Sequence, residues 1–292
     1  MDNPHDTFTP PGCLYVVATP IGNLKDITLR ALEVLQGVDL VASEDTRRTG
    51  RLLSHHGIHT PLVSFHEHNE RQRSLQLVEK LKLGLSVALV CDAGTPSVSD
   101  PGFRLVRAAL DQQIHLIPIP GVSAAITALS VSGLATDSFI FVGFVSKKVP
   151  KRRKQLSTLA REPRTLIFYE SPVRIVGLVT ELIEILGDRP AVLGREMTKQ
   201  FEEFIRARLS IMQDTLTKRS RIKGECTLLV AGVAEPAEES IDLTAAIQEA
   251  LSAGDATASQ IAQRLAKASG IARRTVYEAV LKAQKKARGS GG

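Results

Sequence analysis

The loop at residues 91–102, Cys-Asp-Ala-Gly-Thr-Pro-Ser-Val-Ser-Asp-Pro-Gly, holds the densest group of residues suited to binding a ligand. It follows the apolar run 85–90 and precedes a helical pattern that begins at Phe103, which predicts a position at the carboxyl end of a buried strand. Open α/β sheets bind ligands at that edge. Gly94 would let a ligand approach the backbone, and the hydroxyl of Ser99 could hydrogen-bond to it. Most strand-to-helix connections take about two to six residues, so we interpret this longer loop as a ligand loop rather than a plain connection.

Short polar motifs follow other strand-like runs as well. They are Ala-Thr-Pro-Ile-Gly-Asn-Leu at 18–24, Glu-Asp-Thr-Arg at 44–47, Pro-Ile-Pro-Gly-Val-Ser at 118–123 and Phe-Tyr-Glu-Ser-Pro at 168–172. Their carboxylates, Glu44, Asp45 and Glu170, are candidates for accepting a proton from a substrate. A structural role is the open alternative. Glu44 and Asp45 would then cap a helix that begins near Thr46, and Glu170 would pair with Arg174 one turn later.

The order of the elements predicts the fold class. Strand-like runs alternate with helical patterns over the first half of the chain, which indicates a mostly parallel sheet covered by helices. Further strand-like and helical segments beyond residue 164 predict a second α/β lobe. We therefore expect an α/β fold of two lobes with a small C-terminal helical domain that resembles a helix-turn-helix. The expected domains are 12–145, 146–235 and 240–288, with a basic hinge between the lobes.

Several familiar nucleotide-binding signatures are missing from the sequence. There is no Gly-x-x-x-x-Gly-Lys-Ser/Thr motif, and no Gly-x-Gly-x-x-Gly follows the first strand-like run. ATPases, dehydrogenases and the common Rossmann methyltransferases therefore lose support. Cys13, Cys91 and Cys226 lie far apart beside apolar runs, which predicts buried free thiols. The histidines show no spacing typical of a metal site, so we expect no metal.

The composition indicates a globular protein in water. The chain has 292 residues, of which 43% are hydrophobic and 23% charged. Its longest apolar runs have the length of a strand, and the segment 1–11 has no apolar signal-peptide core. We therefore expect no membrane association and a cytoplasmic location.

Positive charge is concentrated in two segments of a chain with a net charge of +6. Residues 146–164 contain eight Lys or Arg and a single acidic residue, and residues 240–292 are also basic. Such segments favour a polyanionic partner, although a solvated linker and a solvated helix face would explain them equally well. Within the second segment, residues 257–277 have the helix, Gly-containing turn and helix of a helix-turn-helix.

Taken together with Arg-Glu-Met-Thr-Lys at 195–199, the ordered motifs resemble the tetrapyrrole-methylase superfamily over roughly residues 12–235. Within it they are most similar to the bacterial small-subunit ribosomal RNA cytidine 2′-O-methyltransferases, whose appended helical domain the C-terminal residues also resemble. The resemblance implies S-adenosyl-L-methionine in a cleft between two lobes and a homodimer. It also implies methylation of a cytidine in the decoding region of 16S rRNA, either free or within the 30S particle. The porphyrinoid branch usually carries Gly-Asp where this chain has Gly22-Asn23, so a carboxylate used on a tetrapyrrole ring is missing.

The chemistry sets what the site residues must do. Methyl transfer from a sulfonium is an in-line displacement, so the protein mainly aligns a hydroxyl and holds the cofactor in a dry cleft. The residues expected at the cofactor are Pro20, Asp92, Ala93, Gly94, Val98, Ser99, Ser123, Ala124, Tyr169, Glu196, Met197 and Thr227. The residues expected to bind RNA are Arg47, Arg51, Lys151, Arg152, Arg153, Lys154, Arg273 and Arg274.

Two other functions remain open at the level of the sequence. One is a tetrapyrrole-ring methyltransferase of the same fold, which would act on a small macrocycle without RNA. The other is a helix-turn-helix regulator that binds nucleic acid, senses the cofactor and transfers no methyl group.

Overall fold

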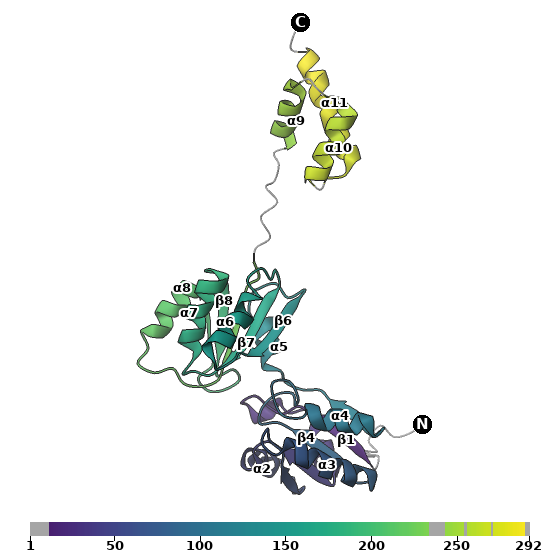
Figure 1. The fold of residues 1–292 in the computed structure, drawn as a ribbon, viewed down its shortest axis with the longest axis vertical. Helices are drawn as coiled ribbons and strands as arrows, with labels where there is room; N and C mark the ends of the chain where they lie inside the picture. Colours follow the sequence, from purple (N-terminus) through teal and green to yellow (C-terminus); the bar gives the residue numbers. More distant parts are fainter. Residues whose placement is uncertain (1–11, 234–242, 254–255, 270, 290–292) are drawn as a thin grey trace. The chain divides into compact units, whose positions relative to one another are not determined.

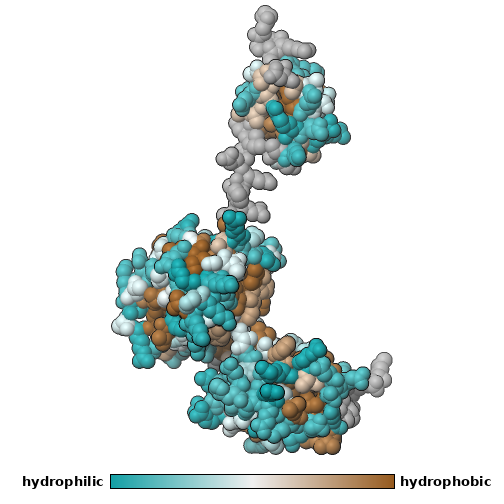
Figure 2. Space-filling model, viewed as in Figure 1, coloured by the Kyte–Doolittle hydropathy of each residue, from teal (hydrophilic) through white to brown (hydrophobic). Residues whose placement is uncertain are grey.

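The computed structural model describes residues 12–233, 243–253, 256–269 and 271–289. The chain divides into two compact units, Met1–Val233 and Ala234–Gly292, and each is described by itself (Figure 1). The first unit contains two five-stranded sheets, and the described residues of the second unit form helices. Figure 2 shows hydrophilic side chains over much of the visible face of both units.

The first sheet is wholly parallel, with the strand order β3-β2-β4-β1-β5. Its strands are β1 (Cys13–Val17), β2 (Leu40–Ser43), β3 (Leu62–Ser64), β4 (Val87–Val90) and β5 (His115–Ile119). Because both faces are covered, β4 is buried at every position. Residues of β1 alternate between two cores, so Val17 packs in the same core as Leu35 and Leu14 in the same core as Leu77.

Helices cover both faces of this sheet. Leu35 belongs to α1 (Leu29–Gly37), and α2 (Thr46–His55) contributes to the same core. The other core contains residues of α3 (Glu70–Lys82) and α4 (Phe103–Asp111). A 3-10 turn, η1 (Leu24–Asp26), lies between β1 and α1. Parallel strands place their carboxyl ends at one edge of the sheet, so the polar motifs after β1, β2, β4 and β5 share that edge.

The second sheet is mixed, with the order β6-β7-β10-β8-β9. Its strands are β6 (Phe139–Phe144), β7 (Thr165–Glu170), β8 (Pro190–Arg195), β9 (Glu203–Arg208) and β10 (Cys226–Val230). β6 and β7 are parallel, and the remaining pairs are antiparallel. One face packs against helices α6 (Val149–Ser157), α7 (Ile175–Leu186) and α8 (Leu209–Thr217). On the other face, Ile167 and Leu229 pack against α5 (Ala124–Ser130).

The boundary between the lobes differs from the prediction. Residues 139–144 form β6 and pair with β7, so they belong to the second sheet although the first domain was expected to reach residue 145. Within the basic segment 146–164, which was expected to form a hinge, residues 149–157 form helix α6. Pro150 lies in the first turn of this helix, where a missing N–H costs nothing. Pro150 therefore marks the start of a helix here.

The second unit contains α9 (Leu243–Ser252), α10 (Ala258–Ser269) and α11 (Arg273–Gly289). They share a small core in which Ile247, Ile261 and Val276 are buried. A capping box starts α10, because Thr257 N donates to Gln260 Oε1 at 2.9 Å and Gln260 N donates to Thr257 Oγ1 at 3.4 Å. The predicted domain limits at residues 235 and 240 lie outside the described residues. In the part of the chain that the structure describes, no helix is both long and apolar enough to cross a membrane.

Candidate active site at the edge of the parallel sheet

A cavity of about 480 Å³ lies where residues of both sheets meet. Most of the residues expected at the cofactor line it, namely Asp92, Ala93, Gly94, Val98, Ser99, Ser123, Ala124, Tyr169 and Thr227. They come from the loops after β4 and β5 and from strands β7 and β10. The edge at which polar loops gather is therefore also the edge that faces the second sheet.

The loop 91–102 is fastened to the first motif of the chain. Gly94 and Thr19 exchange two backbone hydrogen bonds of 2.9 Å, and Thr19 Oγ1 donates to the carbonyl of Cys91 at 3.1 Å. Gly94 adopts φ 84°, and Ser97 and Ser99 adopt φ 69° and 67°. Left-handed backbone is uncommon for residues other than glycine, and such strain concentrates where ligands bind. The loop therefore has backbone conformations that are typical of ligand-binding segments, and its role as a ligand loop stays a prediction.

The far end of the same loop is held by Glu70 of α3. Its carboxylate accepts hydrogen bonds from the backbone N–H of Gly102 at 2.9 Å and of Arg104 at 3.2 Å, which caps the start of α4. Gly102 has φ 141°, and a Cβ there would overlap with Ser97 Oγ. Only glycine fits this position, so the loop folds back tightly before α4 begins.

The second sheet contributes an aromatic wall to the cavity. The hydroxyl of Tyr169 accepts a hydrogen bond from the backbone N–H of Ala125 at 3.1 Å, which ties β7 to the start of α5. Phe141 and Phe144 meet the Tyr169 ring edge-on at centroid distances of 5.0 and 5.6 Å. Thr227 is buried and pairs with Tyr169 across β10 and β7. Burial raises the pKa of Tyr169, so its hydroxyl stays protonated.

Two carboxyl groups in the cavity have raised pKa values. Burial, and then the charge of neighbouring Glu44, raise the pKa of Asp100 to about 6. Burial, and then the charge of Asp92, raise the pKa of Glu44. The three carboxylates follow adjacent strands β2 and β4, which explains why they meet. Glu44 is a candidate from the sequence, whereas Asp100 is not, although it stands within the ligand loop.

The other two proton-accepting candidates have structural partners. Asp45 caps α2 by accepting from Arg47 N at 2.9 Å, and it also pairs with the Arg47 guanidinium at 2.8 Å. The Arg47 side chain holds the pKa of Asp45 well below its usual range, and Asp45 is not among the cavity-lining residues. Glu170 does line the cavity, but it is buried and pairs with Arg174 at 2.6 Å. For these two residues the structural alternative describes what is seen.

Three residues expected at the cofactor do not line the large cavity. Glu196 pairs with Lys199 at 2.8 Å and accepts a hydrogen bond from Glu225 N at 3.1 Å. Met197 is buried in the apolar core beneath α5. Pro20 lines a smaller neighbouring chamber and not the large cavity. Membership of a sequence motif therefore does not by itself place these residues in the large cavity.

The segment 195–199 serves instead to join the lobes. Thr198 Oγ1 accepts a hydrogen bond from the backbone N–H of Asn23 at 3.0 Å, across 175 positions of sequence. A Cβ at Gly22 would overlap with Lys199 and Thr198, so the two segments touch closely there. The first motif and the Arg-Glu-Met-Thr-Lys motif thus form one contact between the two lobes.

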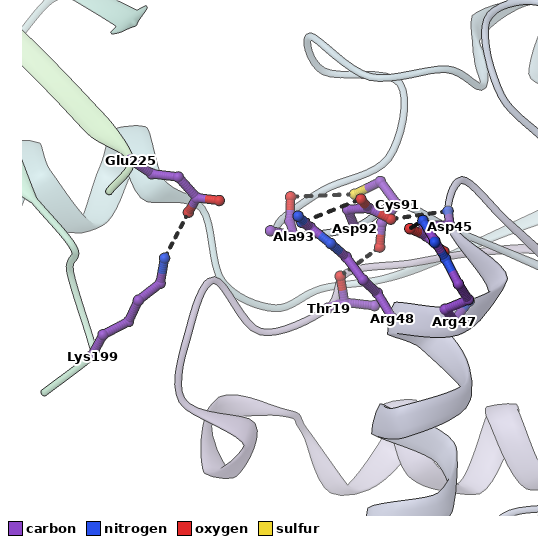
Figure 3. A network of polar contacts seen from close by, with 9 residues as sticks. All are labelled: Thr19, Asp45, Arg47, Arg48, Cys91, Asp92, Ala93, Lys199 and Glu225. Carbon is purple, nitrogen blue, oxygen red and sulfur yellow. Dashed lines mark hydrogen bonds and ion pairs between the residues drawn. The ribbon is translucent and has the colours of Figure 1, made fainter. Parts of the chain in front are cut away.

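The smaller chamber has a volume of about 310 Å³ and shares Ile21, Arg48, Asp92, Ala93 and Glu225 with the large cavity. Figure 3 shows Lys199 and Glu225 of the second lobe on one side and Arg48, Asp92 and Ala93 of the first lobe on the other. Asp92 is fixed by the backbone N–H of Asp45 at 3.0 Å and by Arg48 at 3.3 Å. It therefore stands at the junction of the two chambers.

The residues expected to bind RNA differ in their exposure and in their ion pairing. Arg152 and Arg153 pair with Glu181 and Glu184 of α7, both at 2.6 Å, and the Arg152 pair is largely buried. Lys151 and Lys154 are exposed. Arg51 is exposed and lines the small chamber, and the side chain of Arg47 is 85% exposed despite its pairing. In the second unit, Arg273 donates to Ser259 at 3.1 Å and Arg274 pairs with Glu278 at 3.2 Å.

No group of three or more His, Cys, Asp and Glu side chains with the geometry for a metal ion occurs among the described residues. The three cysteines are buried and form no disulfide. Burial raises the pKa of Cys91 far above its usual range and that of Cys226 to about 12, so both remain protonated.

Solved proteins with this arrangement of two sheets define the fold class. The uroporphyrin-III C-methyltransferase of Thermus thermophilus, solved with S-adenyl homocysteine, matches with a TM-score of 0.56 and 21% identity, over 76% of this chain and 97% of that chain. A diphthine synthase matches with a TM-score of 0.59 and 19% identity, over 75% and 90%. At these identities the likeness concerns the fold alone.

The family follows from the sequence of the chain. The family model for tetrapyrrole (corrin/porphyrin) methylases matches residues 13–212, and the chain belongs to this family. Two relatives are called ribosomal RNA small subunit methyltransferase I. The one from Micromonospora olivasterospora is 47% identical over 270 residues, 92% of this chain and 86% of the relative. The one from Pseudomonas aeruginosa is 45% identical over 278 residues, 94% of this chain and 99% of the relative.

Proposed function

We propose that this protein transfers a methyl group from S-adenosyl-L-methionine to the ribose 2′-hydroxyl of a cytidine in the decoding region of small-subunit ribosomal RNA. The main support for this substrate comes from the relatives named for small-subunit ribosomal RNA. The alignment with one of them covers 99% of its length and 94% of this chain, so it includes the helical unit. Structural likeness alone would not identify the substrate, since proteins of this fold are named for a porphyrin and for diphthine.

The cavity fits the proposed cofactor. Its volume of about 480 Å³ is within the usual range of about 300–1,000 Å³ for small-molecule sites. Apolar side chains such as Ile21 and Val98 can contact an adenine, and the hydroxyls of Ser123 and Thr227 can bind ribose or the amino-acid end. The cofactor supplies the electrophilic methyl group. The protein then has to align the acceptor hydroxyl and exclude water.

Proton acceptance from the ribose hydroxyl is assigned to the pair of carboxyl groups Glu44 and Asp100. Both line the cavity, and each has a pKa raised by burial and by a neighbouring carboxylate. A general base is most effective when its pKa lies near the working pH, which the value of about 6 for Asp100 satisfies. Asp45 and Glu170 have no such role in the proposal, because each is committed to an arginine.

The two alternative functions have weaker support. A tetrapyrrole-ring methyltransferase would usually carry a carboxylate in the first motif, where this chain has Asn23. The side chain of Asn23 caps η1 by accepting from Lys25 N at 3.1 Å, and its backbone N–H donates to Thr198 Oγ1. A regulator that only senses the cofactor gives no reason for two carboxyl groups with raised pKa values in the cavity. Both features favour an enzyme that acts on a hydroxyl.

One assay tests the proposed function directly. Labelled methyl transfer is measured to unmodified 30S subunits, naked 16S rRNA and a tetrapyrrole, and the modified nucleotide is then mapped. We expect transfer to one cytidine ribose of the RNA, either free or within the subunit, and none to the macrocycle. Activity on the tetrapyrrole alone, or tight DNA binding without transfer, would replace the proposal by one of the alternatives. The proposal also places the enzyme in the cytoplasm. It further makes the enzyme a homodimer, and sedimentation analysis can check this oligomeric state.

Substitutions of the basic residues of α6 should have two different effects, one on RNA binding and one on stability. Replacing Lys151 and Lys154 with alanine should weaken RNA binding and reduce the slope of log affinity against log salt by about 1.4, since two phosphate contacts are lost. Replacing Arg152 should instead lower the free energy of unfolding by roughly 1–3 kcal/mol, because it leaves the largely buried Glu181 without its partner. Filter binding at several salt concentrations and urea denaturation measure the two effects. An unchanged salt slope for the double lysine variant would show that α6 does not face RNA.

The helical unit should act on substrate binding and not on chemistry. A chain ending at Ala237, which lies outside the described residues, keeps both sheets and every residue of the cavity. We expect it to bind S-adenosylhomocysteine normally and to show a several-fold higher KM for 30S subunits, because Arg273 and Arg274 would bind ground state and transition state alike. Steady-state kinetics measure this. An unchanged KM with a collapsed kcat would mean that the helical unit takes part in the chemical step.

A further inference from the structure

The smaller chamber adjoins the proposed cofactor site and shares part of its lining. It is lined by Arg48 and Arg51 of α2 on one side and by Lys199 and Glu225 of the second lobe on the other. We propose that this chamber receives the target nucleotide. In this arrangement the two arginines bind its phosphate, and the Lys199–Glu225 pair recognises the base as cytosine. The inference rests on the proposed function, because it presupposes that the acceptor is a cytidine.

The size and position of the chamber suit a nucleotide. A volume of about 310 Å³ lies at the lower end of the range for small-molecule sites. Enzymes that modify a nucleotide commonly take it out of its stack into such a pocket. The chamber shares Arg48, Asp92 and Ala93 with the cofactor cavity, so a ribose at this junction would be open to both spaces. The base could then occupy one chamber while the hydroxyl of the ribose reaches the other.

Two arginines provide the phosphate side. Arg48 and Arg51 are three positions apart on α2, which places them on one face of the helix. The side chain of Arg48 is 59% exposed and its ion pair with Asp92 is 3.3 Å long, while Arg51 is exposed. Guanidinium groups bind phosphate oxygens in a bidentate manner. Neighbouring Arg47 is already occupied by two hydrogen bonds to Asp45, so it competes less for the same phosphate.

The opposite side presents a donor beside an acceptor. Lys199 Nζ is fixed between Glu196 Oε1 at 2.8 Å and Glu225 Oε2 at 3.1 Å. The Glu225 side chain is 65% exposed, so its carboxylate can accept a further hydrogen bond. Cytosine carries an amino group at N4 next to an acceptor at N3, and a carboxylate is a usual partner of the N4 amino group. The ammonium group of Lys199 can donate to N3 or O2.

Uracil would meet the same groups with the wrong polarity. It presents a carbonyl oxygen at position 4, which would face the Glu225 carboxylate without a proton between them, and a donor at N3, which would face the Lys199 ammonium. A site built from hydrogen-bonding groups rejects such an analogue strongly, because its own polar groups lose their partners. The Lys199–Glu225 pair therefore gives the chamber a preference for cytosine over uracil.

The pair also has a structural task, and the test must separate the two. Glu225 N and Lys199 Nζ both donate to Glu196 Oε1, which fastens the segment 195–199 to the residue that precedes strand β10. Glu225→Gln keeps the size of the side chain and an oxygen that can accept from Lys199, so the segment should remain in place. The new amide can donate its NH₂ to the carbonyl of uracil. A purely structural role would change stability or cofactor binding without changing base preference.

The experiment uses the full-length chain and 30S subunits whose target position is cytidine or uridine. We expect the wild type to favour cytidine by about 100-fold or more in kcat/KM, and Glu225→Gln to reduce this ratio at least tenfold. Glu79→Gln, a surface change on α3, serves as the control and should keep the wild-type ratio. Removal of one negative charge raises RNA affinity equally for both substrates, so the ratio is insensitive to it. Glu225 also lines the cofactor cavity, so calorimetry with S-adenosylhomocysteine is run on both variants. Any loss of cofactor affinity acts on both substrates alike and leaves the ratio unchanged.

Other outcomes are equally informative. An active Glu225→Gln enzyme with an unchanged ratio would overturn the inference, and so would a wild type that methylates uridine and cytidine equally. If Glu225→Gln fails to fold, Arg51→Gln decides, because it should raise the KM for cytidine subunits without altering the ratio, and an unchanged KM rejects the chamber. A wild type that methylates neither subunit contradicts the proposed function itself, a result that differs from every one of these.

Discussion

Replacing Asp100 with asparagine should lower kcat for 30S subunits by about 100-fold or more, with cofactor affinity nearly unchanged. The expected loss is the usual contribution of a general base, since asparagine cannot accept the proton of the ribose hydroxyl. In the wild type, kcat should fall as the pH drops below about 6, where Asp100 becomes protonated. The pH profile of single-turnover methyl transfer measures both effects. Asp137→Asn, at an exposed position outside the cavity, is the matched control.

The same substitution should stabilise the cofactor-free protein. The pKa of Asp100 is raised from 3.8 to about 6 in the folded state, so the folded chain binds more protons than the unfolded chain between these values. The free energy of unfolding of the wild type therefore falls as the pH rises from about 4 to 6, and asparagine escapes this loss. Asp100→Asn should gain about 1–3 kcal/mol above pH 6 and nothing below pH 4. Denaturation at several pH values tests this, and a constant difference across the range would contradict it.

Glu44 provides a test of the pair as a unit. Its charge is the second-largest cause of the raised pKa of Asp100, so Glu44→Gln should move the acid limb of the pH profile to lower pH. Asp92 and the Cys91 thiol also face Asp100, and both remain in this variant. A limb that disappears in Glu44→Gln and stays in Asp100→Asn would assign proton acceptance to Glu44 alone.

The sequence could predict which polar loops share one edge of the parallel sheet, because the signal for each loop is local. The apolar run of β4, the glycines of the following loop and the helix of α4 occur in one continuous stretch, and parallel pairing then fixes which loops share an edge. The loop after β4 stands out by its length. Asp100 gives no such signal, because its effect comes from burial and from Glu44, which lies on a strand that becomes a neighbour only in the folded sheet.

Contacts between distant segments set the limit of sequence reasoning. Glu196 and Met197 were expected at the cofactor, but their segment contacts Asn23 and Gly22, whose closeness no local pattern reveals. The basic segment of α6 gives a similar lesson. Its charge predicted a solvated hinge or an RNA contact, whereas Arg152 and Arg153 find their partners on α7, about thirty positions further along. A cluster of basic residues therefore predicts a free charged surface only when the positions of nearby acidic residues are known.

The second large effect is expected at Gly94. Gly94→Val should reduce the affinity for S-adenosylhomocysteine by about 100-fold or more, because the residue lines the cavity and the added methyl groups would occupy space meant for the cofactor. The fold should survive. A Cβ at this position lies 3.7 Å from Ile21 and 3.8 Å from the carbonyl of Val122, which are ordinary contacts, and the hydrogen bonds to Thr19 are made by backbone atoms.

Backbone strain is the complication that a matched control removes. Gly94 has φ 84°, a left-handed conformation that costs an L-residue roughly 1–2 kcal/mol, so valine would destabilise the protein whatever it did to the ligand. Gly84 has φ 89°, a Cβ added there would meet no described atom within 4 Å, and it does not line the cavity. Gly84→Val should therefore show a similar loss in the free energy of unfolding and keep full cofactor affinity in calorimetry. Equal affinity in both variants would mean that the cofactor does not lie against Gly94, and the assignment of the loop 91–102 would then have to be given up.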